Sequence, residues 1–293
     1  MSLADQLDLL LLPEMRACKD RRALEAAIRR RCHTLQVDGE TTLCRILGRY
    51  KFFVDSRDAS LAPHLMLDGY WEFWITDVIW NNVRPGAVCL DVGANLGYYS
   101  VLMAELAGPK GRLIAFEPNR RMAHLLHRNL EINGFLGMAE VSRRAVGATS
   151  GQKLAFQASL EHPKNGTLLS APHAVLAHET LGAATEVETV ALDDYAGTPV
   201  DFIKIDVEGA EEQVWHGMQR LLDASPNVRV LLEFNAARCA HPVELLAHIL
   251  RRFPLRQVDD DAVIRPSDQA ALLNQREDTM LYLSRLDPVQ RGA

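Results

Sequence analysis

The fold is decided by the stretch Val88-Cys-Leu-Asp-Val-Gly-Ala-Asn-Leu-Gly-Tyr-Tyr-Ser100. Val88, Leu90 and Val92 have the apolar, mostly β-branched character of a buried strand. Gly93 and Gly97 allow a tight turn and a close approach of backbone to a ligand. A helix is expected to begin directly after them. Asp91 therefore lies near the carboxyl end of a strand, where open α/β sheets bind their ligands.

Apolar strand patterns and amphipathic helix patterns alternate on the C-terminal side of this turn. The expected strands are 88–92, 112–116, 139–146, 200–205, 227–234, 255–258 and 279–284. The expected helices are 98–107, 119–133, 210–223 and 241–253. This alternation predicts a doubly wound α/β fold with a parallel, helix-covered sheet.

Two regions depart from that alternation. Residues 3–35 have helical spacing, and Thr41–Leu47 with Tyr50–Val54 read as a small β-hairpin, so 1–60 is expected to form an N-terminal helical arm and hairpin. Residues 61–285 would be the main domain and 286–293 a tail. Inside the main domain, 151–198 reads as an insertion with two strands, Lys153–Gln157 and Glu186–Leu192, that pair with each other.

The arm carries many arginines, and three interpretations are open. A solvated helix face is favoured. A homodimer formed through the arm and a surface for an anionic acceptor are the alternatives.

Composition narrows the class of protein. The chain has 293 residues, 48% of them hydrophobic, and a formal net charge of -6, which disfavours wholesale nucleic-acid binding. Its five cysteines are odd in number and include no C-x-x-C pair. Reduced thiols in a cytoplasmic protein are therefore expected. No apolar run approaches the roughly 20 residues needed to span a bilayer.

An acid at the second strand end indicates a nucleoside-containing cofactor. Glu117 follows Gly97 by 20 positions, the separation at which a carboxylate bonds ribose hydroxyls in dinucleotide-binding folds. The dinucleotide signature needs a second glycine where this chain has Asn95, and an acid, Asp91, precedes the turn. That pattern disfavours a diphosphate and favours S-adenosylmethionine, whose ammonium and sulfonium groups are positive.

Six motifs, in order, resemble the FkbM-type methyltransferases. They are DVGANLGYYS (91–100), AFEPN (115–119), N-L-x-x-N (129–133), RAVG (144–147), LDDY (192–195) and DFIKIDVEGAE (201–211). The resemblance covers about residues 52–235. It implies a Rossmann-like class I fold with a seven-stranded, mostly parallel sheet and one antiparallel strand near its edge. It also implies methyl transfer from S-adenosylmethionine, usually to a hydroxyl oxygen of a sugar or natural product.

The resemblance assigns cofactor roles by matching position. Asp91, Gly93, Asn95 and Gly97 would hold the methionine part, and Glu117 the ribose. Arg144 and Ala145 would lie near the adenine. Glu72 matches a glutamate that precedes the first strand and would lie beside the cofactor. The alternative for Glu72 is an acid on a helix surface.

Two carboxylates at the end of the fourth strand are the catalytic candidates. Asp206 and Glu208 are two positions apart on an extended end, so they project to the same side. Methyl transfer to a hydroxyl needs in-line positioning and a base that removes the proton. Glu208 is the first candidate for that base, and Asp206 would orient the substrate or the cofactor ammonium.

A magnesium ion is a less favoured alternative at this sheet edge. Asp206, Glu233 and Asn235 end adjacent predicted strands and offer hard oxygen ligands. In the competing interpretation, Glu233 caps a neighbouring helix or pairs with an arginine. Lys204, inside the fourth strand, is expected to pair with an acid such as Asp91.

The insertion carries further candidates for contact with the substrate. These are His162, Lys164, Asn165, His173 and His178. For each histidine taken singly, a solvated position on the surface is favoured.

The sequence thus predicts an S-adenosylmethionine-dependent O-methyltransferase with a small-molecule or glycan acceptor. Two alternatives remain. A NAD-dependent oxidoreductase would show thermal stabilisation by NAD but none by S-adenosylhomocysteine. A catalytically silent binding module would bind the cofactor without turnover.

Overall fold

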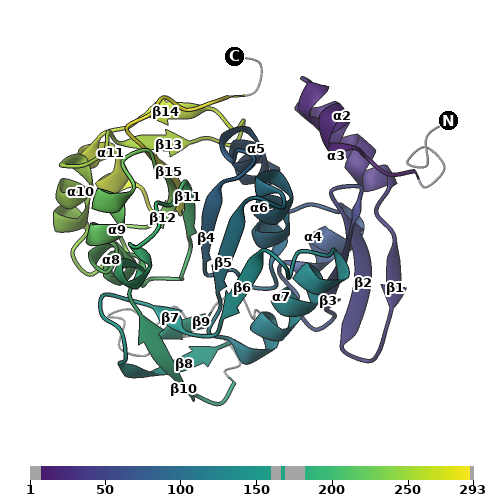
Figure 1. Ribbon diagram of the computed structural model, residues 1–293, viewed down its shortest axis with the longest axis horizontal. Coiled ribbons are helices and arrows are strands. Elements are labelled where there is room, and N and C mark those ends of the chain that lie inside the picture. Colours follow the sequence, from purple (N-terminus) through teal and green to yellow (C-terminus); the bar gives the residue numbers. More distant parts are fainter. Residues whose placement is uncertain (1–7, 160–165, 169–181, 291–293) are drawn as a thin grey trace.

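The computed structural model describes residues 8–159, 166–168 and 182–290, and its centre is an eight-stranded sheet (Figure 1). The strands, in order across the sheet, are β14 (Ile264–Pro266), β13 (Arg256–Val258), β15 (Thr279–Leu283), β12 (Arg229–Phe234), β11 (Phe202–Ile205), β4 (Val88–Val92), β5 (Arg112–Phe116) and β6 (Ala139–Ser142). The five strands from β12 to β6 run parallel to one another. β15 runs antiparallel to both β12 and β13. The predicted α/β fold with a mostly parallel sheet is confirmed.

The sheet differs from the prediction at both edges. It has eight strands instead of seven, because β14 pairs with β13 beyond the implied set. The expected strand 139–146 is divided. β6 stays in the central sheet, whereas β7 (Ala145–Val146) pairs with β10 (Thr185–Val190) in a second sheet.

Helices cover both faces of the central sheet (Figure 1). The helices of one face are α5 (Phe73–Asn82), α6 (Tyr98–Ala107) and α7 (Arg120–Ile132). Those of the other face are α8 (Glu211–His216), α9 (Gln219–Ala224), α10 (Pro242–Leu250) and α11 (Gln269–Asn274). The alternation along β4 explains the two layers, because Cys89 packs in the first core and Leu90 in the second. The helix expected up to residue 223 is broken at Gly217, which caps α8.

The insertion forms a small sheet of its own. β8 (Lys153–Ala158) pairs antiparallel with β10, as predicted, and β9 (Gly166–Leu168) adds to β8. Residues 192–195 form a 3-10 turn instead of extending β10. The candidates His162, Lys164, Asn165, His173 and His178 lie outside the described residues.

The N-terminal region holds two short helices and a three-stranded sheet. The helices are α2 (Leu12–Ala17) and α3 (Arg21–Arg30), and the strands are β1 (Thr34–Gln36), β2 (Thr41–Ile46) and β3 (Tyr50–Asp55), followed by α4 (Ala62–Leu67). The hairpin around Gly48 is confirmed. The prediction of helix up to residue 35 is wrong at its end, because 34–36 pair with β2. Pro13 lies in the first turn of α2, where backbone N–H groups have no partner within the helix. A proline is tolerated there, so Pro13 stands at the beginning of a helix instead of interrupting one.

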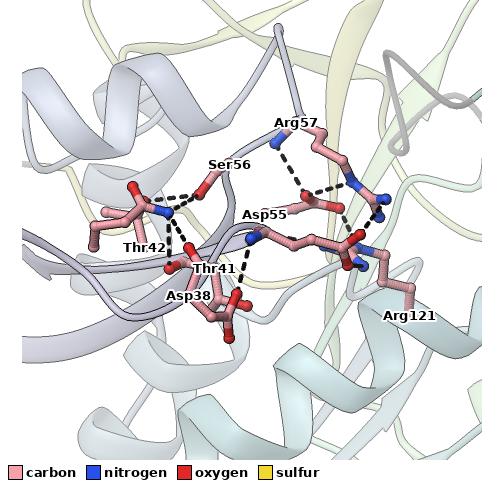
Figure 2. A network of polar contacts seen from close by, with 9 residues as sticks. Asp38, Thr41, Thr42, Asp55, Ser56, Arg57 and Arg121 are labelled. Atoms are coloured by element: carbon pink, nitrogen blue, oxygen red, sulfur yellow. Dashed lines mark hydrogen bonds and ion pairs between the residues drawn. The ribbon is translucent and has the colours of Figure 1, made fainter.

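A buried carboxylate fastens this region to α7 (Figure 2). Asp55, at the end of β3, accepts hydrogen bonds from Arg121 on α7 and from the backbone of Arg57. Both arginines also bind Glu40 in the turn between β1 and β2. Burial alone would raise the pKa of Asp55, but these hydrogen bonds lower it. The network therefore keeps an ion pair at the contact between the N-terminal sheet and the main fold.

Two asparagines, one on α7 and one at its C-terminal cap, add direct bonds to β3. The side chain of Asn129 accepts from the N–H of Phe53 (2.6 Å) and donates to its carbonyl (3.0 Å). Asn133, one helical turn later, bonds both backbone groups of Lys51. The N-L-x-x-N motif thus pairs with the outer edge of a strand. The division of the chain at residues 60 and 285 and dimerisation through the arm stay predictions.

Of the helices within the described residues, none combines the length and apolarity needed to cross a membrane. The five cysteines, all in the described part of the chain, are free thiols.

Candidate functional site

A cavity of about 230 Å³ lies at the carboxyl ends of the central strands. Its wall includes the turn after β4, the residues that follow β5 and β11, and Glu233 near the end of β12. The predicted site residues that line it are Glu72, Gly93, Asn95, Glu117, Arg144, Ala145, Asp206, Glu208 and Glu233. Asp91, Gly97 and Asn235 are not among the lining residues. The location is the one expected for a ligand of an open α/β sheet.

The two glycines of the turn have different tasks. Gly93 has φ +79°, and a Cβ there would lie 1.8 Å from the carbonyl oxygen of Asp206, so any side chain would displace the end of β11. Gly97 caps α6 with φ +93°, and a Cβ there would lie 2.5 Å from Cδ1 of Leu126. Gly93 therefore shapes the cavity wall, whereas Gly97 allows α6 and α7 to pack closely.

Glu117 is held by backbone on both sides. Its Oε2 accepts from the N–H of Asn95 and its Oε1 from the N–H of Asn119, each at 2.8 Å. Burial raises the pKa of Glu117 to about 7, although these two bonds lower it. Two backbone N–H groups thus orient the carboxylate. Each carboxylate oxygen can accept a second hydrogen bond from a hydroxyl donor.

Asp91 lies behind the cavity wall. It is 1% exposed, and its Oδ2 accepts from Oγ of Ser100 at 2.5 Å. Its Oδ1 has no hydrogen-bond partner within the described part of the chain. Burial raises the pKa of Asp91, and the charge of Lys204 opposes that shift.

Lys204 pairs with Asp206 instead of the suggested Asp91. Its Nζ lies 3.0 Å from Oδ2 of Asp206 and 5.0 Å from the ring centre of Tyr99. Asp91 faces Lys204 across the β4–β11 ladder. Burial by itself would lower the pKa of Lys204. The negative charges of Asp206 and Asp91 outweigh that effect and raise the pKa, so this buried side chain stays charged.

An arginine that the sequence analysis did not single out gathers three acids. Arg238 donates to Oε2 of Glu208 (2.5 Å) and Oε2 of Glu233 (2.6 Å), and it also binds Asp278. Burial beside Asp206 and Glu208 raises the pKa of Glu233. A signal for this arginine was available, because several acids at one sheet edge require a nearby cation and Arg238 follows Glu233 by five positions.

This arrangement corrects the magnesium hypothesis. Glu233 binds Arg238, and Nδ2 of Asn235 donates to Asp278 at 2.8 Å, so neither side chain turns to a shared ion with Asp206. The described residues contain no group of three or more His, Cys, Asp or Glu placed to hold a metal. The alternative interpretation, in which an arginine pairs with Glu233, is confirmed.

Unusual backbone conformations concentrate at the cavity. Glu72, Asn95 and Glu208 line it with φ of +35°, +52° and +55°. Left-handed conformations in such residues cost energy and are frequent at functional sites. Glu72 accepts from the hydroxyl of Tyr99 at 2.9 Å, so it is not an acid on a helix surface. Arg144 reaches the hydroxyl of Tyr195 at 3.0 Å.

A protein-family model described as the methyltransferase FkbM domain matches residues 91–258. Methyltransferase sdnD of Sordaria araneosa is 29% identical over 164 residues, which are 47% of this chain and 62% of that protein. A protein-L-isoaspartate O-methyltransferase of Aeropyrum pernix is 47% identical over 58 residues, which are 20% of this chain and 22% of that protein. The alignments thus span less than two thirds of these curated relatives.

Among solved structures, an FkbM methyltransferase of Methylobacillus flagellatus has a TM-score of 0.44 at 16% identity, with 71% of this chain and 50% of that chain covered. An S-adenosylmethionine-dependent O-methyltransferase of Thermotoga maritima has a TM-score of 0.41 at 13% identity, with 88% and 97% covered.

Proposed function

We propose that this chain, which belongs to the FkbM methyltransferase family, transfers a methyl group from S-adenosylmethionine to a hydroxyl oxygen of a sugar, glycan or natural product. The observation that carries the proposal is Glu117, a carboxylate fixed by two backbone N–H groups in the same cavity as the Gly93 turn. A carboxylate at the end of the second strand of such a unit suits a ribose.

The cofactor would lie along the ends of β5, β4 and β11. Glu117 would accept hydrogen bonds from both ribose hydroxyls, and the adenine would lie toward Arg144 and Ala145. The methionine part would follow the turn at Gly93 and Asn95, with its ammonium near Asp206. The cofactor supplies an electrophilic methyl group on a sulfonium.

Asp91 contributes from behind this wall. It holds Ser100 at the start of α6 and lies opposite Lys204, which in turn orients Asp206. Its carboxylate lies under the place proposed for the ammonium, and the charge of Lys204 favours the ionised form of Asp91.

The acceptor hydroxyl must lose its proton as the new C–O bond forms. Glu208 stays the first candidate for the base, since its carboxylate lines the cavity and Arg238 fixes its orientation. Asp206, held by Lys204, would orient the substrate or the cofactor ammonium. No metal is part of this proposal.

Calorimetry with S-adenosylmethionine and S-adenosylhomocysteine tests the proposal. We expect both to bind, and we expect Glu117→Ala and Asp91→Ala to abolish binding while the fold is retained. Glu140→Ala is the matched control, because Glu140 pairs with exposed Arg112 at the far end of β5 and lies outside the cavity lining. Failure of the unmodified protein to bind either compound would refute the proposal.

A further inference from the structure

The two ends of the cavity differ in charge. Beyond β11, its lining includes the acids Glu208, Glu233 and Asp278. On the other side of Glu117 lies an end that we call the β6 end. Its described lining residues follow β6 or come from the insertion, and they are Arg144, Ala145, Val146, Phe156 and Gly166. The β6 end therefore contains apolar side chains, a glycine and a cation, and none of these residues is an acid.

The insertion reaches the β6 end because its small sheet continues directly from β6. Two residues separate β6 from β7, and the small sheet then follows in the order β7, β10, β8 and β9. Figure 1 shows this sheet beside β6. Phe156 of β8 belongs to one apolar cluster with Ala145 of β7 and Val187 of β10. The strand pairing therefore holds Phe156 at the β6 end of the cavity.

Phe156 and Gly166 fit each other closely. Gly166 is on β9, which pairs antiparallel with β8. A Cβ at Gly166 would lie 2.4 Å from Cζ of Phe156, so glycine allows the main chain of β9 to lie this near the ring. Phe156 is 6% exposed, and both residues line the cavity. Together they form an apolar wall whose position is fixed by the pairing of β8 with β9.

The charge of the β6 end determines which part of the cofactor suits it. The guanidinium of Arg144 is held there by the hydroxyls of Tyr195 (3.0 Å) and Ser142 (3.3 Å). It repels the positive sulfonium and ammonium groups of S-adenosylmethionine, whereas adenine is uncharged and flat. Every nucleobase has a π-face that packs on aromatic side chains.

The sheet order agrees with that assignment. Glu117, the proposed ribose ligand, follows β5, and β6 is the next strand. Neighbouring strands are about 4.8 Å apart, so a base joined to a ribose at Glu117 reaches the end of β6.

We infer that Phe156, together with the main chain at Gly166, packs against the nucleobase of the cofactor. The inference rests on the proposed function and adds to it a binding residue from the insertion. The sequence analysis expected the insertion to contact the substrate. Its described lining residues serve the cofactor instead, and they close the site at the end opposite to Glu208.

Nuclear Overhauser effects test the contact directly. The full chain, with isotope-labelled phenylalanine rings, is saturated with S-adenosylhomocysteine, and cross-peaks to the two ring protons of adenine are recorded. Phe156→Leu removes the signals of one ring and so assigns them. We expect cross-peaks between the ring of Phe156 and adenine.

The same variant measures what the contact contributes to affinity. Loss of an aromatic contact with a base should raise the Kd for S-adenosylhomocysteine about fivefold or more in Phe156→Leu. Phe253→Leu is the matched control, because Phe253 is 2% exposed, packs beside Trp215 and lies outside the cavity lining. It should leave the Kd unchanged.

Two outcomes would overturn the inference while the proposed function stands. In the first, S-adenosylhomocysteine binds but gives no cross-peak between adenine and Phe156. In the second, Phe156→Leu binds it as tightly as Phe253→Leu, which would assign the insertion to the acceptor side. Failure of the unmodified protein to bind S-adenosylhomocysteine is a different result, because it refutes the proposed function and this inference with it.

Discussion

The backbone N–H of Asn95 donates a 2.8 Å hydrogen bond to Oε2 of Glu117 and so joins the turn after β4 to the end of β5. Asn95 forms this bond in the left-handed conformation, at φ +52°. Asparagine tolerates that conformation better than most residues. The main chain of the turn thus orients the carboxylate before any ligand arrives.

The first prediction concerns the pH dependence of nucleoside binding. Burial raises the pKa of Glu117 from 4.5 to about 7, so between these pH values the folded protein keeps Glu117 protonated. The contribution of Glu117 to the free energy of unfolding therefore falls as the pH rises from 4.5 to about 7. Ribose hydroxyls donate to the anion. Adenosine affinity should therefore rise with pH, about tenfold per unit well below 7, and level off above it.

Adenosine is the suitable probe because it lacks the amino-acid part of the cofactor. Isothermal titrations between about pH 5.5 and 8.5 measure the profile. Glu117→Gln should bind more weakly and give a flat profile. A slope that persists in Glu117→Gln would show that another group titrates.

The second prediction concerns the close approach at Gly93. Gly93→Ala places a Cβ 1.8 Å from the carbonyl oxygen of Asp206, so β11 must shift and cofactor binding should be lost. Gly86→Ala is the control, because Gly86 is also left-handed, at φ +84°, but has open space around its Cβ position. The control should cost about 1 kcal/mol of unfolding free energy. Urea unfolding of both variants gives the comparison, and equal losses would contradict the steric argument.

The third prediction concerns the buried ion pair of Lys204 with Asp206. Lys204→Met leaves the charges of Asp206 and Asp91 without their cation, and it should cost about 3 kcal/mol or more. S-adenosylhomocysteine affinity should also fall, because Asp206 loses its orientation. Lys153→Met removes an exposed pair with Glu186 and should leave stability and binding unchanged. Thermal and urea unfolding measure stability, and a Lys204→Met protein as stable as the control would refute this assignment.

The fourth prediction concerns Asn129 on α7 and Asn133 at its C-terminal cap. Asn129 is fully buried and forms hydrogen bonds with the N–H and carbonyl of Phe53 and with the carbonyl of Leu96. Asn129→Leu therefore leaves these three backbone groups without their hydrogen-bond partner. It should cost about 3 kcal/mol. Asn133→Leu should cost about 1 kcal/mol, because Asn133 is partly exposed and water replaces its bonds to Lys51. The reverse order in urea unfolding would show that these bonds do not hold the N-terminal sheet.

The fifth prediction concerns the base. Glu208→Gln keeps the size of the side chain and removes its proton affinity, so turnover should fall about 10²- to 10⁴-fold. S-adenosylhomocysteine affinity should stay close to that of the unmodified protein. Transfer of labelled methyl from S-adenosylmethionine into metabolites of the source cells measures turnover. Undiminished transfer would exclude Glu208 as the base.

The sequence by itself determined the order and type of the central elements. Local patterns sufficed for most of them, because the buried strands are short apolar runs and several helices begin or end at a recognisable residue. Asn119, for example, stands at the start of the expected helix 119–133 and caps α7 by accepting from the backbone N–H groups of Arg121 and Met122. The location of Gly93, Glu117 and Asp206 at one edge followed from the same alternation, since parallel strands end on the same side.

Only the tertiary structure decided the partners of the charged side chains. The strand pattern shows which face of the sheet Lys204 lies on. Whether Lys204 binds Asp206 or Asp91 depends on side-chain geometry across β11 and β4. Arg238 comes from an irregular segment with no periodic pattern, and its role exists only because three separate segments bring Glu208, Glu233 and Asp278 around it. Sequence periodicity reports the backbone and the burial of each element, whereas ion pairs form between segments that only folding brings together.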